Sequence, residues 1–217
     1  IVVRRDHFAR RVVHFELWVG ESIGEAVRHS CANDQPFGAA IVKGATVNLQ
    51  LLLPAWRAYL QEQGALLEEH LALLSLEITA DEVKYGEISA GKIIFCDGIA
   101  TTANPFFRQV KFLPNKGEVL FVKVPGLDTT DIIKKSITLV PQGDGLYWAG
   151  SSFVWDYADD HPTGKQREML EKSLQQLLKV PYKITGQQAA VRPSGNDRRP
   201  IIGLHPEMPA VGIFNGL

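Results

Sequence analysis

The chain has 217 residues, which is enough for one or two domains with a sizeable hydrophobic core. Hydrophobic residues make up 45% and charged residues 22% of it, an ordinary globular composition that excludes disordered, collagen-like and coiled-coil proteins. Because the net charge is only -1, the sequence predicts neither nucleic acid nor an anionic membrane as a partner.

Several further signals bear on the compartment. No apolar run approaches the roughly 20 residues of a membrane helix, and no signal peptide is recognisable. Cys31 and Cys96 fit no disulfide or zinc spacing, and the chain has no Asn-x-Ser/Thr glycosylation site. We therefore expect a protein of the reducing cytoplasm without a metal site. Because the chain starts at Ile1 and stops in Gly216-Leu217, we also expect it to be cut from a larger protein.

The first half of the chain changes from helix to strand signals. Weak patterns predict a strand over 14–19 and a helix over 21–30. Asn48 can cap a helix that ends at Gly64, although Pro54 is awkward inside it. The apolar positions of this helix recur every three to four residues. They are Leu52, Leu53, Trp56, Tyr59 and Leu60.

Short strands are predicted to follow this helix. The apolar run Lys92–Cys96 is typical of a strand that is buried on both faces, and Asp97-Gly98 ends it. The turn residues 142–145 predict a hairpin between two strands. The predicted strands are 65–69, 76–79, 82–85, 92–96, 118–124, 136–140 and 146–151.

A second amphipathic helix is predicted over 163–178, where Thr163 and Gln166 form a capping box. Its predicted buried stripe is Met169, Leu170, Leu174, Leu177 and Leu178. Strands at 183–192, 200–203 and 211–214 complete the chain. The pattern predicts an α+β fold with a mixed, largely antiparallel sheet. That sheet is expected to consist chiefly of 65–69, 118–124, 136–151 and 183–192, with helices 50–63 and 163–178 packed outside it.

Recognised catalytic motifs are missing or incomplete. Gly86–Lys92 matches part of a phosphate-binding loop, but Ile93 stands where a hydroxyl residue is needed, and a strand follows where a helix is needed. We therefore expect a loop between strands there. The sequence contains no G-x-G-x-x-G dinucleotide motif, no metal-binding spacing and no nucleophile elbow. The residues alone therefore supply no catalytic constellation.

Arg192 is the strongest candidate for a binding residue. It follows the small apolar run Ala189–Val191 at the end of a predicted strand, and the polar turn 196–200 comes soon after it. A guanidinium held against apolar walls binds a carboxylate through two parallel charge-assisted hydrogen bonds. The alternative is an ordinary surface arginine before a turn.

The segment 190–203, with its Val-Arg-Pro and Arg-Pro-Ile-Ile-Gly strings, resembles a block of the FAD-dependent oxidoreductases of the D-amino-acid oxidase, glycine oxidase and sarcosine oxidase family. Segments 92–105, 114–120, 139–156 and 212–217 are similar to further blocks of that family in the same order. The resemblance covers about residues 37–217. Thr138 stands where the family often has a tyrosine, and the family's N-terminal dinucleotide-binding unit has no counterpart here.

The resemblance implies a division of the chain between two domains of a flavoprotein. Residues 1–36 remain unplaced, 37–92 enter the substrate domain, 93–110 belong to the FAD-binding domain, 111–192 form the substrate-binding α+β domain, and 193–217 return to an incomplete FAD-binding domain. It also implies roles for single residues. Arg192 would hold a substrate carboxylate and Thr138 would face the substrate. The expected cofactor-side residues are Asp97, Gly98, Lys116, Gly117, Arg199, Pro200, Ile202 and Gly203.

The implied function is an FAD-dependent oxidation of the C–N bond of an amino acid or amine by hydride transfer to flavin. The expected partner is therefore a small molecule, and the oligomeric state is left open. Because the chain lacks the glycine turn that receives the FAD pyrophosphate, it is expected to bind FAD poorly and to be inactive by itself. Two alternatives stay open: a non-catalytic binding or scaffold module of the same fold, and an FAD-linked dehydrogenase or tRNA-modifying oxidase.

Overall fold

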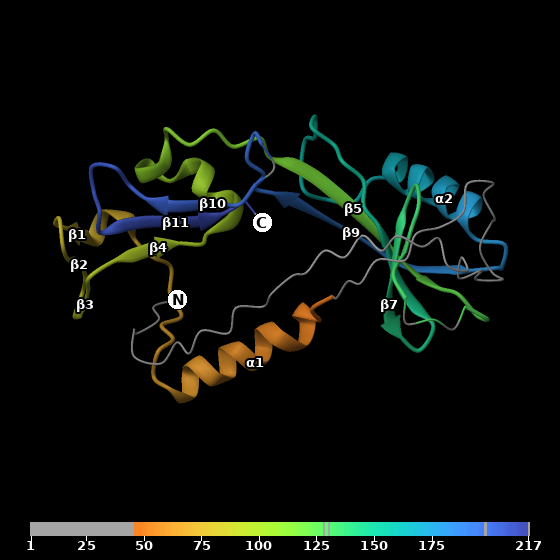
Figure 1. The fold of residues 1–217 in the computed structure, drawn as a ribbon, viewed down its shortest axis with the longest axis horizontal. Coiled ribbons are helices and arrows are strands. Elements are labelled where there is room, and N and C mark those ends of the chain that lie inside the picture. Colours follow the sequence, from red (N-terminus) through yellow and green to blue (C-terminus); the bar gives the residue numbers. More distant parts are fainter. Residues whose placement is uncertain (1–45, 128, 130, 198, 217) are drawn as a thin grey trace, which may run out of the picture. The chain divides into compact units, whose positions relative to one another are not determined.

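The computed structural model describes residues 46–127, 129, 131–197 and 199–216, which divide into two compact units (Figure 1). The first unit contains residues 46–74 of this set, and the second contains the described residues from Ser75 onward. The predicted strand at 14–19 and helix at 21–30 lie outside the described residues. Neither α-helix of the described part has the length and apolar character needed to cross a lipid bilayer.

Helix α1 (Leu49–Glu62) confirms the first predicted helix. The Asn48 side chain accepts a hydrogen bond from the backbone N–H of Leu51, and Gly64 leaves the helix with a φ of +60°. Pro54 is accommodated within the helix. Its apolar side chains are mostly exposed and Leu60 alone is buried, so the packing of α1 against a sheet stays a prediction.

The predicted strand at 65–69 is wrong, because this segment forms no strand in the structure. Its Glu68 side chain contacts the preceding helix instead. The Glu68 carboxylate forms an ion pair with Arg57 and accepts a hydrogen bond from Gln61 at 3.3 Å. These contacts join the segment to α1, and it forms none of the backbone pairing of a β-sheet.

The second unit contains three sheets, and a short 3₁₀ turn (Leu73–Ser75) precedes the first of them. Strands β1 (Leu76–Ile78), β2 (Val83–Tyr85) and β3 (Ile88–Ala90) form a small antiparallel sheet. Residues 86–92, expected to be a loop, include β3, which turns back onto β2 at Gly86. Strand β4 follows Lys92 directly, so the helix that a phosphate-binding loop requires after its lysine is not there.

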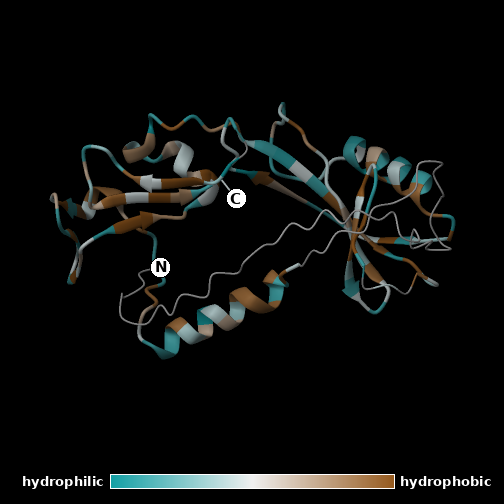
Figure 2. Ribbon diagram, in the orientation of Figure 1, coloured by the Kyte–Doolittle hydropathy of each residue, from teal (hydrophilic) through white to brown (hydrophobic). Residues whose placement is uncertain are grey.

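The second sheet has the order β10-β11-β4 and combines both strand directions. It comprises β4 (Ile93–Phe95), β10 (Ile201–Leu204) and β11 (Val211–Asn215). Strand β11 runs antiparallel to β10 and parallel to β4, and both β4 and β11 are strongly hydrophobic (Figure 2). Short helical turns at Gly98–Ala103 and Pro105–Phe107 follow β4.

The expectation that β4 is buried on both faces is wrong. Phe95 is buried and meets the rings of Phe106 and Phe107 at 5.7 and 5.8 Å, whereas Ile94 is 47% exposed on the opposite face. Successive side chains of a strand point to opposite faces, so the aromatic cluster covers one side of β4 only.

The third sheet has five antiparallel strands in the order β6-β7-β8-β5-β9. Its strands are β5 (Asn115–Lys123), β6 (Ile133–Lys134), β7 (Thr138–Gly143), β8 (Leu146–Gly150) and β9 (Lys183–Arg192). The predicted strands at 118–124, 136–140, 146–151 and 183–192 and the turn at 142–145 are confirmed. The α+β class with a mixed, largely antiparallel arrangement is therefore correct.

Helix α2 (Gly164–Leu177) packs on one face of this sheet (Figure 1). Leu170, Leu174 and Leu177 of the helix lie in one hydrophobic cluster with Leu120 and Leu139 of the sheet. Met169, predicted to be buried, is 44% exposed. Its position is about 100° around the helix from Leu170, which leaves it at the flank of the buried stripe.

Candidate functional site

Strand β5 separates two environments on the two faces of the sheet. Lys116, Glu118 and Leu120 point towards α2 and are buried, whereas Gly117 and Val119 point to the other face. Strand pairing extends this second face over β7, β8 and β9. We call it the open face. Its residues are Asn115, Gly117, Val119, Phe121, Thr138, Val140, Trp148, Gly150, Gly186, Gln188, Ala190 and Arg192.

Arg192 lies at the end of β9, directly opposite Asn115 of β5. Its Nη1 donates hydrogen bonds to Oδ1 of Asn115 at 2.8 Å and to the carbonyl oxygen of Ser152 at 3.4 Å. Its Nη2 donates to Oγ of Ser151 at 2.7 Å. Asn115 is itself fixed by a hydrogen bond from its Nδ2 to Oγ of Ser194 at 2.9 Å. The guanidinium is therefore held by three residues from two segments, β5 and the residues that follow β8.

Gly117 provides the room that this guanidinium occupies. A Cβ atom at Gly117 would lie 2.0 to 2.4 Å from Nη2, Cζ and Nη1 of Arg192, which is far inside van der Waals contact. The ring of Phe153 also contacts the group, with its centroid 4.6 Å from Cζ. A cation is attracted to the face of an aromatic ring, so Phe153 adds to the fixation.

The charge of Arg192 has no acidic partner among the described residues, because its three protein acceptors are all neutral. Burial lowers the pKa of the guanidinium from its usual value. A guanidinium has five N–H donors, so these three hydrogen bonds leave two donors, the Nε–H and one Nη2 hydrogen, for a ligand. An oriented, partly desolvated cation with two such donors is suited to a carboxylate.

Thr138 lies on the same face and at the same end of the sheet. It pairs with Gly150, which precedes the Ser151 that binds Arg192. The two residues predicted to bind substrate, Arg192 and Thr138, are thus placed at one end of the open face. Thr138 is not among the hydrogen-bond partners of Arg192, so its role stays a prediction.

The structure gives Lys116 and Gly117 different surroundings, although both were expected on the cofactor side. The amino group of Lys116 is buried, donates to the carbonyl oxygen of His161 at 2.6 Å and lies 3.4 Å from the Glu118 carboxylate. It is also 3.8 Å from Asp159. Lys116 is therefore engaged on the α2 side, and Gly117 lies beneath Arg192 on the open face.

Asp97 and Gly98 lie beyond the carboxyl end of β4, next to the carboxyl end of the parallel strand β11. The Asp97 carboxylate accepts hydrogen bonds from the Thr101 hydroxyl and from Asn104. Asn215 of β11 donates from Nδ2 to the carbonyl oxygen of Gly98 at 2.8 Å. Gly98 has a φ of +57° and no atom within 4 Å of a Cβ position, so a planar group can approach its backbone closely.

The other four residues expected at the cofactor lie around β10 and are exposed. They are Arg199, Pro200, Ile202 and Gly203. The Arg199 backbone N–H donates to Oδ1 of Asp197 at 3.1 Å, and Ile202, opposite Phe214 of β11, is 64% exposed. The structure therefore gathers these residues on the β10-β11-β4 sheet, whereas Arg192 and Thr138 belong to the five-stranded sheet.

Sequence reasoning missed the residues that fix Arg192 and Gly98. They are Asn115, Ser151, Ser152, Phe153 and Asn215. Asn115 lies two residues before Gly117, but its role depends on the register between β5 and β9. Such a register is set by tertiary packing and leaves no local signal at a single asparagine.

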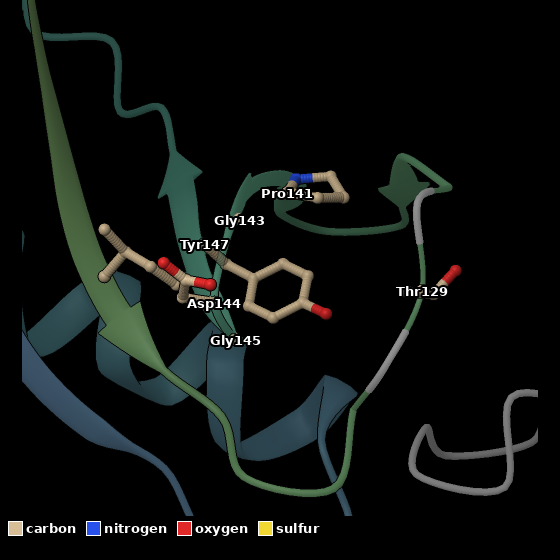
Figure 3. A pocket seen from close by; sticks show the side chains of 7 residues that line it. Thr129, Pro141, Gly143, Asp144, Gly145 and Tyr147 are labelled. Carbon is tan, nitrogen blue, oxygen red and sulfur yellow. The ribbon is translucent and has the colours of Figure 1, made fainter.

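A separate pocket lies at the other end of the β7–β8 hairpin (Figure 3). It is lined by Thr129, Pro141, Gly143, Asp144, Gly145, Leu146 and Tyr147. None of these is a predicted site residue. Leu146 and Gly150 mark opposite ends of β8, so this pocket and the Arg192 region are distinct sites of the sheet.

Comparison with known proteins places this geometry in context. The family model described as "FAD dependent oxidoreductase" matches residues 4–217. The structure is also similar to iminodiacetate oxidase from Chelativorans sp. BNC1, with a TM-score of 0.62 and 20% identity over 77% of this chain and 49% of that one.

Two further solved structures have the same fold. Glycine oxidase from Bacillus cereus ATCC 14579 gives a TM-score of 0.61 and 18% identity over 75% of this chain and 48% of the other. L-proline dehydrogenase from P. horikoshii gives 0.58 and 18% identity over 76% and 49%. The chain thus spans about half the length of these solved proteins.

Proposed function

The chain belongs to the FAD dependent oxidoreductase family, and from this premise we propose that the protein containing it oxidises the C–N bond of an amino acid, with Arg192 holding the substrate carboxylate. The observation that carries the proposal is the state of the Arg192 guanidinium. It is partly buried and bound only to neutral acceptors, and two of its N–H donors remain for a ligand. A carboxylate would supply the missing negative charge.

The residues around β4 and β10 fit a flavin. Gly98 leaves its backbone open to close approach, and Pro200, Ile202 and Gly203 present exposed, uncharged surface beside it in the same unit. FAD, when bound, supplies the acceptor for the hydride that leaves the carbon next to the amine nitrogen. Asn215 supports this surface because its amide fixes the Gly98 carbonyl oxygen.

The part of this chain in the reaction is to bind and orient. Two N–H donors in a rigid fork fix both the position and the plane of a carboxylate, and this limits the orientations of the adjacent carbon. Asn115, Ser151 and Ser152 prevent the guanidinium from rotating away. The small Gly117 lets it lie close to the sheet, where water is partly excluded.

Substitution of Arg192 in the protein that contains this chain tests the proposal. Arg192→Ala should lower kcat/KM for amino acids by about 30-fold to several thousand-fold, which corresponds to about 2–5 kcal/mol for a buried charge pair. Arg192→Lys should restore part of this loss, because an ammonium group cannot form the bidentate contact. Amines without a carboxylate should be affected much less.

Flavin content provides the control. Because Arg192 is assigned to the substrate, the visible flavin spectrum of the Arg192→Ala protein should match that of the wild type. Equal losses for carboxylate-bearing and neutral amines, or loss of flavin with the arginine, would show that Arg192 is structural. A protein that gains no flavin bands when FAD is added would favour the scaffold alternative.

A further inference from the structure

We propose that the open face selects amino acids with an uncharged, apolar side chain. This inference rests on the proposed function, because it takes Arg192 as the carboxylate site, and it adds the class of substrate. The evidence is the set of side chains that surround Arg192 on the open face, together with the way large side chains lie over glycines there.

The first observation is the lack of charge next to Arg192. Its neighbours on the open face of β5, β8 and β9 carry no charge. They are Asn115, Gly117, Val119, Trp148, Gly150, Gln188 and Ala190. The nearest charged positions on this face lie at its far limits. Lys123 is six residues along β5 from Gly117, roughly 20 Å in a strand. Lys134 of the outer strand β6 is opposite Thr138, in the row of Gly150 and Val119, and is three strands or roughly 14 Å from Val119.

The second observation is that this part of the open face is largely apolar, with Gln188, opposite Val119, as a polar exception. Val119 and Trp148 lean over Gly150, where a Cβ would be only 2.7 and 3.1 Å from their side chains. Phe121 covers Gly186 in the same way, at 3.6 Å. All three large side chains are half-buried, so part of each remains accessible. A ligand on this face therefore meets hydrocarbon on the side that adjoins Arg192.

These observations define the ligand chemically. A carboxylate bound at Arg192 places the rest of the molecule over Val119 and Trp148. An apolar side chain gains free energy from leaving water there. A second carboxylate or an ammonium would lose its hydration without a partner, and the ammonium would in addition be repelled by Arg192. Norvaline, glutamate and ornithine have the same number of carbon atoms and differ in the charge at the end of the side chain, so they isolate this effect.

Binding is measured without turnover. The probes are pentanoate, glutarate and 5-aminopentanoate, which lack the α-amine and cannot be oxidised at a C–N bond beside the carboxylate. Calorimetric titration into the protein that contains this chain should give pentanoate at least about tenfold tighter binding than the other two. In the FAD-loaded protein, kcat/KM should favour norvaline over ornithine and glutamate by a similar factor, whichever enantiomer is accepted.

A variant pair tests the position of the apolar surface. Val119→Asp should raise the ornithine-to-norvaline ratio of kcat/KM at least about tenfold, because a carboxylate then faces the substrate side chain. The matched control is Val119→Asn, which has the same shape without the charge and should not raise the ratio. An equal rise in both variants would overturn the assignment of Val119. If Val119→Asp does not fold, the wild-type titrations still decide the proposal.

The two proposals fail in different ways. If glutarate binds as tightly as pentanoate and Arg192→Ala weakens both, the selection for apolar side chains is wrong and the carboxylate site stands. If Arg192→Ala changes the binding of none of the three probes, the carboxylate site itself is wrong, and the proposed function loses its main support.

Discussion

The buried carboxylate of Glu118 accepts both hydrogen-bond donors of Thr163, the residue that caps α2. Oε2 accepts the Thr163 backbone N–H at 2.8 Å, and Oε1 accepts its hydroxyl at 2.9 Å. The Thr163 hydroxyl also accepts the Gln166 backbone N–H at 3.4 Å. The predicted capping box is therefore half correct, because Glu118 of β5 takes the place of the Gln166 side chain.

The first prediction is that Glu118→Gln lowers the free energy of unfolding by about 3–5 kcal/mol, as for removal of one member of a buried ion pair. Glu118 also accepts a hydrogen bond from Gln187 at 2.8 Å, and its ion-pair partner Lys116 is equally buried. Glutamine would present an N–H₂ group to these donors and leave the Lys116 charge without its buried partner, with only the exposed Asp159 at 3.8 Å. Urea denaturation measures the difference.

The control for Glu118→Gln is Glu171→Gln. Glu171 pairs with Arg167 one turn away on the outer part of α2, at 2.8 Å, and both side chains are partly exposed. An exposed pair of this kind contributes about 0.3–0.5 kcal/mol. Similar losses in the two variants would contradict the view that the Glu118 network fastens α2 to the sheet.

The second prediction concerns Gly117→Ala. The new Cβ would overlap the guanidinium of Arg192, which is the flexible end of a long side chain and can move away. The carboxylate site should therefore be lost almost as completely as in Arg192→Ala, while the melting temperature falls by less than about 4 °C, or roughly 1 kcal/mol. The double variant should be no worse than either single variant, because both remove the same interaction.

Gly186→Ala provides the control for Gly117→Ala on the same face. A Cβ at Gly186 would meet Phe121 at 3.6 Å, an ordinary van der Waals distance. This variant should bind carboxylates like the wild type. If it loses binding as Gly117→Ala does, the effect is general to the sheet, and the space beneath Arg192 is not its cause.

The third prediction is a pH dependence at Cys96. Burial, and secondarily the neighbouring Asp97 carboxylate, raises the pKa of this thiol above its ordinary value. The thiolate is the reactive form, so alkylation by iodoacetamide should reach its half-maximal rate at a higher pH than that of an unperturbed thiol. Asp97→Asn should shift this midpoint back to lower pH. Mass spectrometry of the Cys96 peptide follows the reaction, and an unchanged midpoint in Asp97→Asn would contradict the charge effect.

The fourth prediction is that the 217-residue chain by itself binds FAD weakly. Its sequence has no glycine-rich dinucleotide motif, and backbone N–H groups at such a turn are a main source of affinity for the pyrophosphate. A fluorescence titration of FAD with the purified chain measures this. Tight stoichiometric binding would mean that other residues of the chain hold the pyrophosphate.

The sequence predicted the elements of this fold better than their contacts. Helix α2 and the strands β5, β7, β8 and β9 have strong periodicity and defined turns, and they occur where the pattern places them. The segment 65–69 has the pattern of a strand, but its Glu68 side chain contacts Arg57 and Gln61 of α1 and no strand forms. Local pattern carries no information on such a competing tertiary contact.

The candidate site shows the same limit. Arg192 was identifiable because it follows a small apolar run at a predicted strand end, in a segment that resembles a block of the flavoenzyme family. Its holding groups were not, since Ser151 and Asn115 lie about 40 and 80 residues away in sequence and meet Arg192 through strand pairing. The burial of Lys116 was hidden for a similar reason, because His161, whose carbonyl oxygen it binds, lies 45 residues away in the sequence.

The parallel pairing of β4 with β11 has a consequence for the order of folding. Ile93 of β4 pairs with Val211, so this contact closes a loop that contains the entire five-stranded sheet. The strands of the hairpin β7–β8, in contrast, are neighbours in sequence. Since distant pairings form more slowly than local ones, we expect the five-stranded sheet to assemble first and to bring β4 and β11 together. On a ribosome, the Asp97–Gly98 surface would then be completed only when β11 has emerged.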